Sequence, residues 1–386
     1  MRDYESLARA LVDRSLPATT LSHPSGARLE VAPPMSAAIA DTWTPSGLLR
    51  GNAGLSLLFV HEAVRDHVTA QAALARYLRT ALDDCRRNRL LGLDRGLCGV
   101  GLVAEVAAAE GAPLEHVRGA LFRRVTERVE AVCALDDLWA NPPAGLLDLF
   151  GGAAGWLIYL SLPGVPRSRA EFRLTERLAR VLREGVDTRP WILGGAAHGL
   201  TGIALALVAG KRQLSPPVVT ALHDYAERML PTLAANVRPD LRWCQGSLGQ
   251  IEALWAIGRR IGRPDFVDQA ARLASEVARQ RLWRDMPVGG MCHGLGGVLL
   301  AMQRAHIRTG DGVFEDAITE LSEVLLRRSS LDQTYALYPG VDQPSLSEWE
   351  PDPSLASGLA GVGLLLLDAA TERTGLWSWS FGYTQD

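Results

Sequence analysis

The stretch GGMCHGLGGVLLAMQRA, residues 289–305, decides how this sequence folds. Cys292 and His293 stand side by side in a segment that is mostly glycine, and an apolar run follows directly. Glycine resists regular helix, so the first half predicts a loop, and the apolar run predicts a helix that opens at the glycines. The loop therefore delivers a thiol and an imidazole to one place.

The same unit, G-x-x-G followed at once by an apolar run, occurs seven times along the chain. The first glycines of the seven pairs are Gly51, Gly96, Gly152, Gly199, Gly246, Gly294 and Gly358. Successive first glycines are 45, 56, 47, 47, 48 and 64 residues apart. A spacing of about 47 residues holds two helices of ordinary length with their turns. Each repeat therefore predicts a helical hairpin.

Two kinds of helix alternate within the repeats. In residues 265–283, apolar residues recur every three or four positions with charged residues between them, which is typical of a surface helix. The segments that open at the glycine pairs, such as residues 203–210, are apolar nearly all round, so they must be covered on more than one side. The sequence thus predicts an all-α fold, a seven-hairpin (α/α) toroid or barrel with inner apolar and outer amphipathic helices.

Closure into a ring is favoured over an open solenoid, because the first and last repeats are as apolar as the middle ones and would make poor polar caps. The 386 residues then form a single domain, 1–386. Residues 1–40 are expected to add an N-terminal helical extension, because charged and apolar residues mix at helical spacing at its start. Residues 328–353 are expected to form a loop or insertion, because this part of the longest gap is rich in proline.

Composition excludes several classes of function. The net charge is -3 and no run of Lys or Arg stands out, which argues against nucleic-acid binding. The longest apolar run, residues 358–370, is too short for a bilayer, which takes about 20 residues, and the N-terminus lacks a secretory signal. Five cysteines, an odd number, argue against a disulfide framework. We expect a cytoplasmic protein without a transmembrane segment.

In a closed α/α ring every inner helix begins at the same end, so the residues before the glycine pairs meet at one mouth. Asp148, His198, Cys244 and the Cys292–His293 pair precede the glycines of repeats three through six. Cys244 and Cys292 hold the same position in adjacent repeats. Two thiolates and one imidazole form a three-ligand set of the kind that catalytic zinc sites use.

Each of these residues also has a plain structural interpretation. Cys85, Cys98 and Cys133 have no partner beside them and read as buried thiols, although Cys98 lies in the second glycine loop. His198 is equally compatible with a structural histidine at a helix start, and Asp148 with a helix N-cap. A glycosidase on a similar barrel would need two facing carboxylates, and the cysteines count against that reading.

The motifs AHGLTG (197–202), WCQGSLG (243–249) and CHGLGG (292–297) resemble the signature of the lanthionine synthetase C-like (LanC-like) family. The resemblance includes the seven-fold glycine pattern and covers the chain from about residue 40 onward. It implies an α/α toroid with a central zinc ion held by Cys244, Cys292 and His293. It further implies that His198 is the catalytic histidine and that Asp148 is its acidic neighbour.

One departure from the family pattern concerns the residues around Cys244. Family cyclases often carry an arginine four residues before this cysteine and an aromatic residue after it, whereas this chain has Asp240 and Gln245. Arg238 and Arg242 are nearby candidates for the guanidinium, and the sequence assigns neither.

The resemblance implies a zinc-dependent lanthipeptide cyclase. Such enzymes add cysteine thiols of a dehydrated ribosomal precursor peptide to dehydroalanine or dehydrobutyrine and so form (methyl)lanthionine thioether rings. A separate dehydratase, or a kinase/lyase of the same pathway, is the expected source of that peptide. Two alternatives stay open: a LanC-like transferase that adds glutathione to dehydroamino acids, and a non-catalytic, zinc-containing scaffold that binds a peptide or partner.

Overall fold

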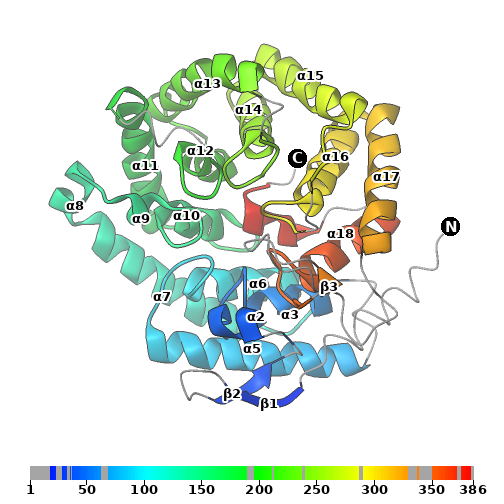
Figure 1. Ribbon diagram of the computed structural model, residues 1–386. Coiled ribbons are helices and arrows are strands. Elements are labelled where there is room, and N and C mark those ends of the chain that lie inside the picture. The colour runs from blue at the N-terminus through cyan, green and yellow to red at the C-terminus, as the bar shows by residue number, and fades with distance from the viewer. Residues whose placement is uncertain are drawn as a thin grey trace.

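The computed structural model describes residues 18–22, 28–32, 35, 37–61, 68–188, 195–210, 213–236, 240–286, 290–328, 337–338, 350–371 and 375–383. Helices in these ranges form two concentric layers around a common centre (Figure 1). The inner layer consists of α3 (Asn52–Val60), α6 (Leu97–Ala109), α10 (Ala153–Ser161), α12 (Leu200–Ala209), α14 (Ser247–Ile261), α16 (Leu295–Thr309) and α18 (Leu359–Thr371). Successive inner helices contact each other, and α18 returns to contact α3, which closes the ring.

The outer layer follows the inner one hairpin by hairpin. It consists of α5 (Val68–Asn88), α7 (Glu115–Cys133), α11 (Arg169–Thr188), α13 (Pro216–Asn236), α15 (Pro264–Gln280) and α17 (Gly312–Arg328). Each of these packs against the inner helix that precedes it. The prediction of an all-α toroid with inner and outer helices is confirmed.

Hydrophobic pattern decides which layer a helix joins. All residues of α3 and of α12 are buried, as their apolar composition requires. In contrast, α7 buries Leu121, Val125, Val129 and Cys133, which share one face at a spacing of four, and leaves its charged face outside.

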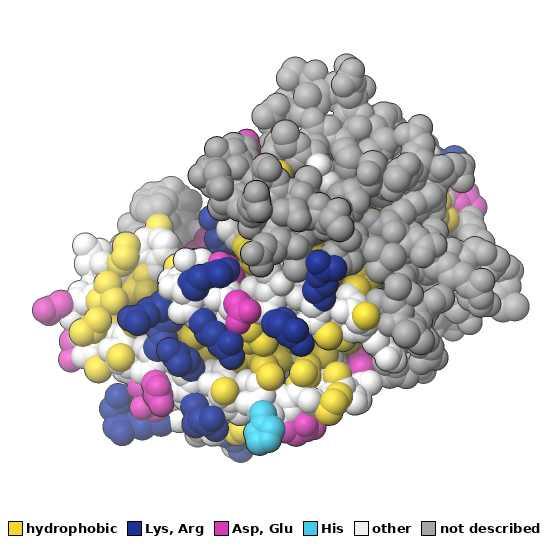
Figure 2. Space-filling model, turned by 90° about the horizontal axis from the view of Figure 1, so that it is seen from below, with side chains coloured by type: hydrophobic (Ala, Val, Ile, Leu, Met, Phe, Trp, Pro, Cys, Tyr) yellow, Lys and Arg dark blue, Asp and Glu magenta, His cyan; other side chains and the backbone are white. Residues whose placement is uncertain are grey.

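Seen from below, where α5 lies near the lower edge of the ring, the described surface carries many Lys and Arg side chains (Figure 2).

The seventh repeat departs from a simple hairpin in the described part of the chain. After α18 comes a short 3₁₀ helix, η2 (Leu376–Phe381), which lies near the centre of the ring (Figure 1). Trp377, Trp379 and Phe381 of η2 are buried. The Asp368 carboxylate in α18 accepts hydrogen bonds from the Trp377 indole N–H (2.9 Å) and the Gly375 backbone N–H (3.1 Å). The C-terminal segment therefore packs inside the ring and fills part of its core.

The N-terminal region differs from the helical extension expected over residues 1–40. Strands β1 (Ala18–Ser22) and β2 (Arg28–Ala32) pair antiparallel, and a short helix, α2 (Ala37–Thr42), follows. Residues 1–16, on which the helical expectation was based, lie outside the described residues. The hairpin has a local cause, because β1 and β2 contain β-branched Thr19, Thr20 and Val31, which favour extended structure.

Three further short elements complete the fold: α8 (Asp136–Ala140), α9 (Ala144–Leu147) and the strand pair β3 (Leu337–Tyr338) and β4 (Glu350–Pro351). The strand pair falls within the loop or insertion expected over residues 328–353, most of which lies outside the described residues. Among the helices that the structure describes, none combines the length and apolar character needed to cross a membrane.

Candidate metal centre

The glycine pairs have a steric cause that also builds the site. A Cβ on Gly249 would lie 2.4 Å from the carbonyl oxygen of Trp243 and 2.7 Å from the Cβ of Ala196. A Cβ on Gly297 would lie 2.3 Å from the carbonyl oxygen of Met291. Both distances are far below van der Waals contact, so only glycine lets the loop six residues upstream fold over the start of the inner helix.

Backbone hydrogen bonds join the seven loops into a closed ring. In each of them, an N–H of one loop donates to a carbonyl of the neighbouring loop, at 2.6 to 3.4 Å. The bonds run from Leu48 to Asp94, Asp94 to Phe150, Leu149 to Ala197, Ala197 to Cys244, Cys244 to Cys292, Cys292 to Ala356, and Ala356 to Leu49. Equivalent positions of adjacent repeats are therefore neighbours in space, wherever they stand in the sequence.

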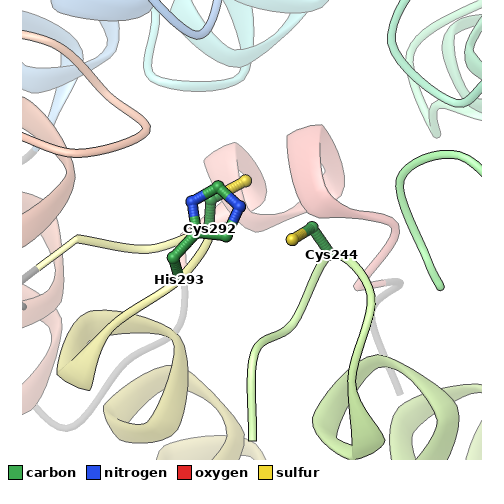
Figure 3. A group of neighbouring side chains, drawn as sticks. All are labelled: Cys244, Cys292 and His293. Carbon is green, nitrogen blue, oxygen red and sulfur yellow. The ribbon is translucent and has the colours of Figure 1, made fainter. Parts of the chain in front are cut away.

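This ring brings the three sequence-predicted metal ligands together. The Sγ atoms of Cys244 and Cys292 and a ring nitrogen of His293 all lie within 4.8 Å of one another. Cys244 comes from the loop before α14, and Cys292 and His293 from the loop before α16 (Figure 3). Both cysteines are buried and His293 is half-buried.

The donor set fits zinc better than the other common protein metals. Thiolate and imidazole are the ligands that Zn²⁺ prefers, with metal–ligand distances of about 2.0 to 2.3 Å, so a shared ion is within reach of all three atoms. A hydrogen bond from the Cys292 thiol, aided by the hydrogen bond and charge of His293, outweighs burial and lowers the pKa of Cys244 to about 5. Cys244 is therefore a thiolate at neutral pH, the form that binds a metal.

His198 and Asp148 form a pair beside these donors. Nδ1 of His198 hydrogen-bonds Oδ2 of Asp148, while Oδ1 of Asp148 accepts the backbone N–H groups of Phe150 and Gly151, each at 2.7 Å. Burial raises the pKa of Asp148, but these hydrogen bonds outweigh it and leave that pKa below its ordinary value. The Asp148 hydrogen bond in turn raises the pKa of His198, with a smaller contribution from the charge of Cys244.

One cavity of about 750 Å³ is lined by all five predicted site residues: Asp148, His198, Cys244, Cys292 and His293. The sequence places the ionisable residues of this mouth in repeats three through six, but other repeats contribute as well. Arg50, Asp94, Arg95 and Ser357, from repeats one, two and seven, line the same cavity. Their position before a glycine pair was the available signal, since the closed ring brings all seven loops to this mouth.

Arg242, one of the two arginines considered near Cys244, is not among the residues that line this cavity. Arg242 forms a paired contact with Asp240, with Nη2 2.7 Å from Oδ2 and Nε 2.9 Å from Oδ1. Arg238 lies outside the described residues. Gln245, which stands where family cyclases have an aromatic residue, does line the cavity.

The other cysteines are buried thiols, as expected. Cys85, Cys98 and Cys133 are unpaired and buried, and Cys98 does not line the cavity despite its place in a glycine loop. Burial raises the pKa of Cys133 to about 11, and that of Cys98 well above its ordinary value. These three thiols therefore stay protonated and inert at neutral pH.

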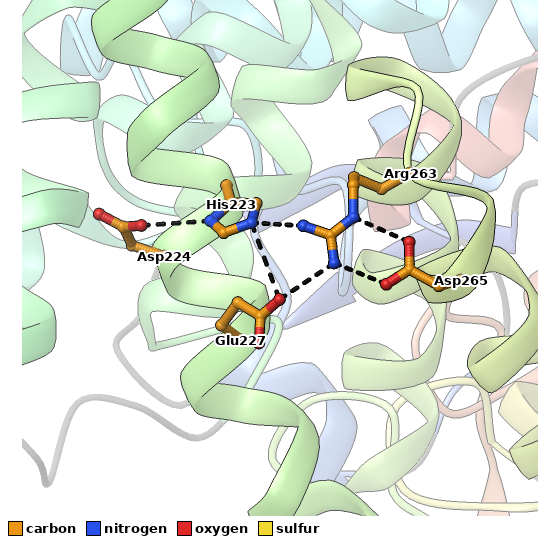
Figure 4. A network of polar contacts seen from close by, with 5 residues as sticks. All are labelled: His223, Asp224, Glu227, Arg263 and Asp265. Atoms are coloured by element: carbon orange, nitrogen blue, oxygen red, sulfur yellow. Dashed lines mark hydrogen bonds and ion pairs between the residues drawn. The ribbon is translucent and has the colours of Figure 1, made fainter.

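A second histidine cluster, between α13 and the start of α15, has a different character (Figure 4). His223 contacts Asp224, Glu227 and the Arg263 guanidinium, which also binds Glu227 at 3.1 Å and Asp265 at 2.6 Å. The Arg263 guanidinium thus occupies the central position that a metal ion would need. This cluster links α13 to the first turn of α15.

The fold and the site together define a class: a closed ring of helical hairpins whose loops gather two thiols and an imidazole beside a histidine–aspartate pair. The model of the family described as lanthionine synthetase C-like protein matches residues 42–381. The chain belongs to this family. Among solved structures it is similar to nisin cyclase, with a TM-score of 0.66 and 16% sequence identity over 88% of this chain and 92% of that one. At this identity the likeness concerns the fold.

Proposed function

We propose that this protein is a zinc-dependent lanthipeptide cyclase, which adds a peptide cysteine thiol to a dehydroalanine or dehydrobutyrine of the same peptide. The observation that carries the proposal is one cavity shared by a three-donor metal set and a histidine–aspartate pair. Membership of the lanthionine synthetase C-like family and the likeness to nisin cyclase support it.

Cys244, Cys292 and His293 would hold the zinc ion. Three protein ligands are the number found at catalytic zinc sites, whose fourth ligand is water or substrate. When bound there, zinc supplies Lewis acidity that lowers the pKa of a coordinated substrate thiol and so presents it as the nucleophilic thiolate.

His198 would carry the proton through the reaction. Its Nδ1 is engaged by Asp148, which leaves Nε2 to accept the proton of the substrate thiol. The sulfur then bonds to the β-carbon of the dehydro residue, the π electrons move to the carbonyl as an enolate, and His198 returns the proton to the α-carbon. The sum is addition of S–H across C=C, so the product has the mass of the substrate.

Asp148 would act by orienting His198 and by stabilising its protonated form. The raised pKa of His198 is consistent with that task, because a higher pKa keeps the imidazolium available as the acid near neutral pH. Asp148 itself is fixed by two backbone N–H groups of its own loop, so the histidine is held by a rigid partner.

The test uses the purified full chain and a synthetic peptide with one cysteine and one dehydroalanine. We expect about one zinc per chain and loss of free thiol, measured with a maleimide reagent, at unchanged peptide mass. His198→Ala should retain zinc and lose turnover, whereas Cys292→Ala should lose both. Thiol loss no faster than in a no-enzyme control, by zinc-loaded protein, would refute the proposal.

A further inference from the structure

A second cavity, of about 370 Å³, lies outside the metal centre and is dominated by positive charge. It is lined by Cys85, Arg89, Leu97, Arg124 and Arg128. Arg89 directly follows α5, Arg124 and Arg128 lie in α7, and no carboxylate is among the lining residues. Three guanidinium groups around one small cavity repel each other and favour an anion between them.

The three pocket arginines differ from Arg118 and Arg177 in what they bind. Arg118 pairs with Glu105 at 2.6 Å, and Arg177 pairs with Asp136. Arg89, Arg124 and Arg128 form no ion pair with any residue in the described ranges. The arginine pocket, as we call the cavity lined by these three residues, therefore has unused donor groups.

The other polar groups of the arginine pocket do not compete for an anion. Burial, followed by the charge of Asp84, raises the pKa of the Cys85 thiol to about 12, so this thiol is neutral and unreactive at neutral pH. The Asp84 carboxylate is engaged elsewhere, because it accepts hydrogen bonds from Ser46 (2.6 Å) and Asn88 (2.7 Å). A ligand here would be held by charge and hydrogen bonds and not covalently.

The lining of the arginine pocket continues along the chain into the lining of the metal-centre cavity. Arg89 lines the first, and the two residues that follow it, Leu90 and Leu91, line the second. Arg89 has a φ of 54°, a left-handed conformation that side-chain-bearing residues seldom adopt, at this junction. Arg50 and Arg95 lie on the wall of the larger cavity, where Arg95 pairs with Asp94 at 3.6 Å.

The outer helices α5 and α7 carry more positive than negative side chains. Both helices contain arginines but no lysine, and their arginines outnumber their acidic residues. Lys and Arg side chains are prominent on the described part of this face (Figure 2). Because the whole chain has a net charge of -3, the positive charge is a local feature of this face.

We propose that the arginine pocket binds carboxylate side chains of an acidic segment of the peptide substrate while the reacting part of that peptide occupies the neighbouring cavity. The proposal rests on the proposed function, since its ligand is the peptide that the cyclase acts on. Guanidinium forks match carboxylates in geometry. Nucleic acid fits less well, because no aromatic side chain lines the arginine pocket for a base to stack on.

Docking of an acidic segment tethers the reacting residues near the metal centre and raises their effective concentration. An acidic tail on a substrate should therefore lower KM and leave kcat largely unchanged. Electrostatic contacts at an exposed pocket weaken with salt, so this advantage should shrink at high ionic strength.

The first experiment measures binding alone. A fluorescent, unstructured peptide of Glu, Gly and Ser is titrated with the full chain and compared with the same peptide carrying Gln for Glu. We expect the Glu peptide to bind more tightly, and Arg124→Gln/Arg128→Gln to weaken it about tenfold. The matched control Arg79→Gln/Arg123→Gln removes two arginines from α5 and α7 outside the pocket lining and should change binding much less.

The second experiment compares KM for a dehydrated peptide with and without an acidic tail. The tail should lower KM in the native chain, and the Arg124→Gln/Arg128→Gln variant should lose that benefit. Equal binding of the Glu and Gln peptides, equal effects of the two double variants, or displacement of the Glu peptide by an oligonucleotide at lower concentration would overturn the proposal. The binding experiment needs no turnover, so a failure of the proposed cyclase activity would be seen separately.

Discussion

Replacing Asp148 with asparagine tests the proposed role of the histidine–aspartate pair. Oδ1 of Asp148 accepts two backbone N–H groups, and an asparagine carbonyl oxygen can keep both bonds. The Oδ2 position then becomes an NH₂ group that faces Nδ1 of His198. The neutral imidazole must accept at Nδ1 and carry its proton on Nε2, so it cannot take a proton from a thiol.

The size of the effect follows from the contact that is lost. A hydrogen bond to a charged group contributes about 1.5 to 3 kcal/mol. The His198 side chain is 61% exposed, so the lower end applies, which corresponds to about a tenfold loss in kcat/KM from orientation alone. The wrong tautomer adds to this loss. In serine proteases, replacing the equivalent aspartate with asparagine lowers kcat about 10⁴-fold.

The pH profile gives an independent readout. In the native chain the Asp148 hydrogen bond raises the pKa of His198, so the protonated donor persists to higher pH. Activity should fall as pH rises through that pKa. In Asp148→Asn the pKa of His198 returns toward its ordinary value, and the alkaline limb of kcat/KM moves to lower pH.

A matched control for Asp148→Asn is Asp352→Asn. Oδ1 of Asp352 likewise accepts the N–H two residues ahead, from Ser354 at 2.8 Å, and its other oxygen accepts a serine hydroxyl. Asp352→Asn should therefore cost a similar amount of loop stability and leave the alkaline limb in place. An equal loss of activity in both variants, or an unshifted limb in Asp148→Asn, would refute the assigned role.

Three further predictions concern the metal loops and the core. Cys292→Ser should retain the fold, measured by far-UV circular dichroism, and bind zinc at least about tenfold more weakly, because a hydroxyl is a poor substitute for a thiolate; undiminished zinc affinity would contradict the ligand set. Arg308→Met should lower the free energy of unfolding by about 3 to 5 kcal/mol in urea, because it leaves the buried Glu252 carboxylate unpaired, and adding Glu252→Gln should restore most of this loss. Phe381→Ala should lower the free energy of unfolding by about 3 to 5 kcal/mol and weaken zinc binding, and Phe381→Leu should have smaller effects on both. Normal zinc affinity in Phe381→Ala would show that η2 does not support the metal centre.

The toroid was predictable because the same steric constraint applies at the equivalent position of every repeat. Where a loop crosses the start of an inner helix, a Cβ would collide with a carbonyl oxygen, as at Gly249 and Gly297. Glycine is then the only residue that fits, and it therefore recurs at regular intervals along the sequence. The placement of Cys244 beside Cys292 follows from the same periodicity, because the backbone ring makes equivalent positions adjacent.

The features that the sequence did not predict depend on side chains without such a constraint. Arg50 and Arg95 reach the main cavity from repeats one and two, but an arginine near a glycine loop is common on any surface. The arginine pocket is lined by Arg89 and by residues of α7 that lie far along the chain from it. No continuous run of basic residues in the sequence therefore indicates this pocket. Pocket linings of this kind become visible only once the helices are packed.

The packing beneath the metal loops indicates that the site is rigid before any ligand binds. Trp243, one residue before Cys244, lies 5.2 Å from Phe381 and 5.9 Å from Phe150 between ring centroids, and Phe150 lies 6.2 Å from Phe381. Phe150 also fixes the loop of Asp148 through its N–H. The donors of the metal set and the histidine–aspartate pair therefore rest on one aromatic cluster completed by the C-terminal segment. Because that cluster is buried and close-packed, little conformational entropy remains to be lost when a metal or a substrate is bound, which favours tight metal binding and a fixed distance between nucleophile and proton donor.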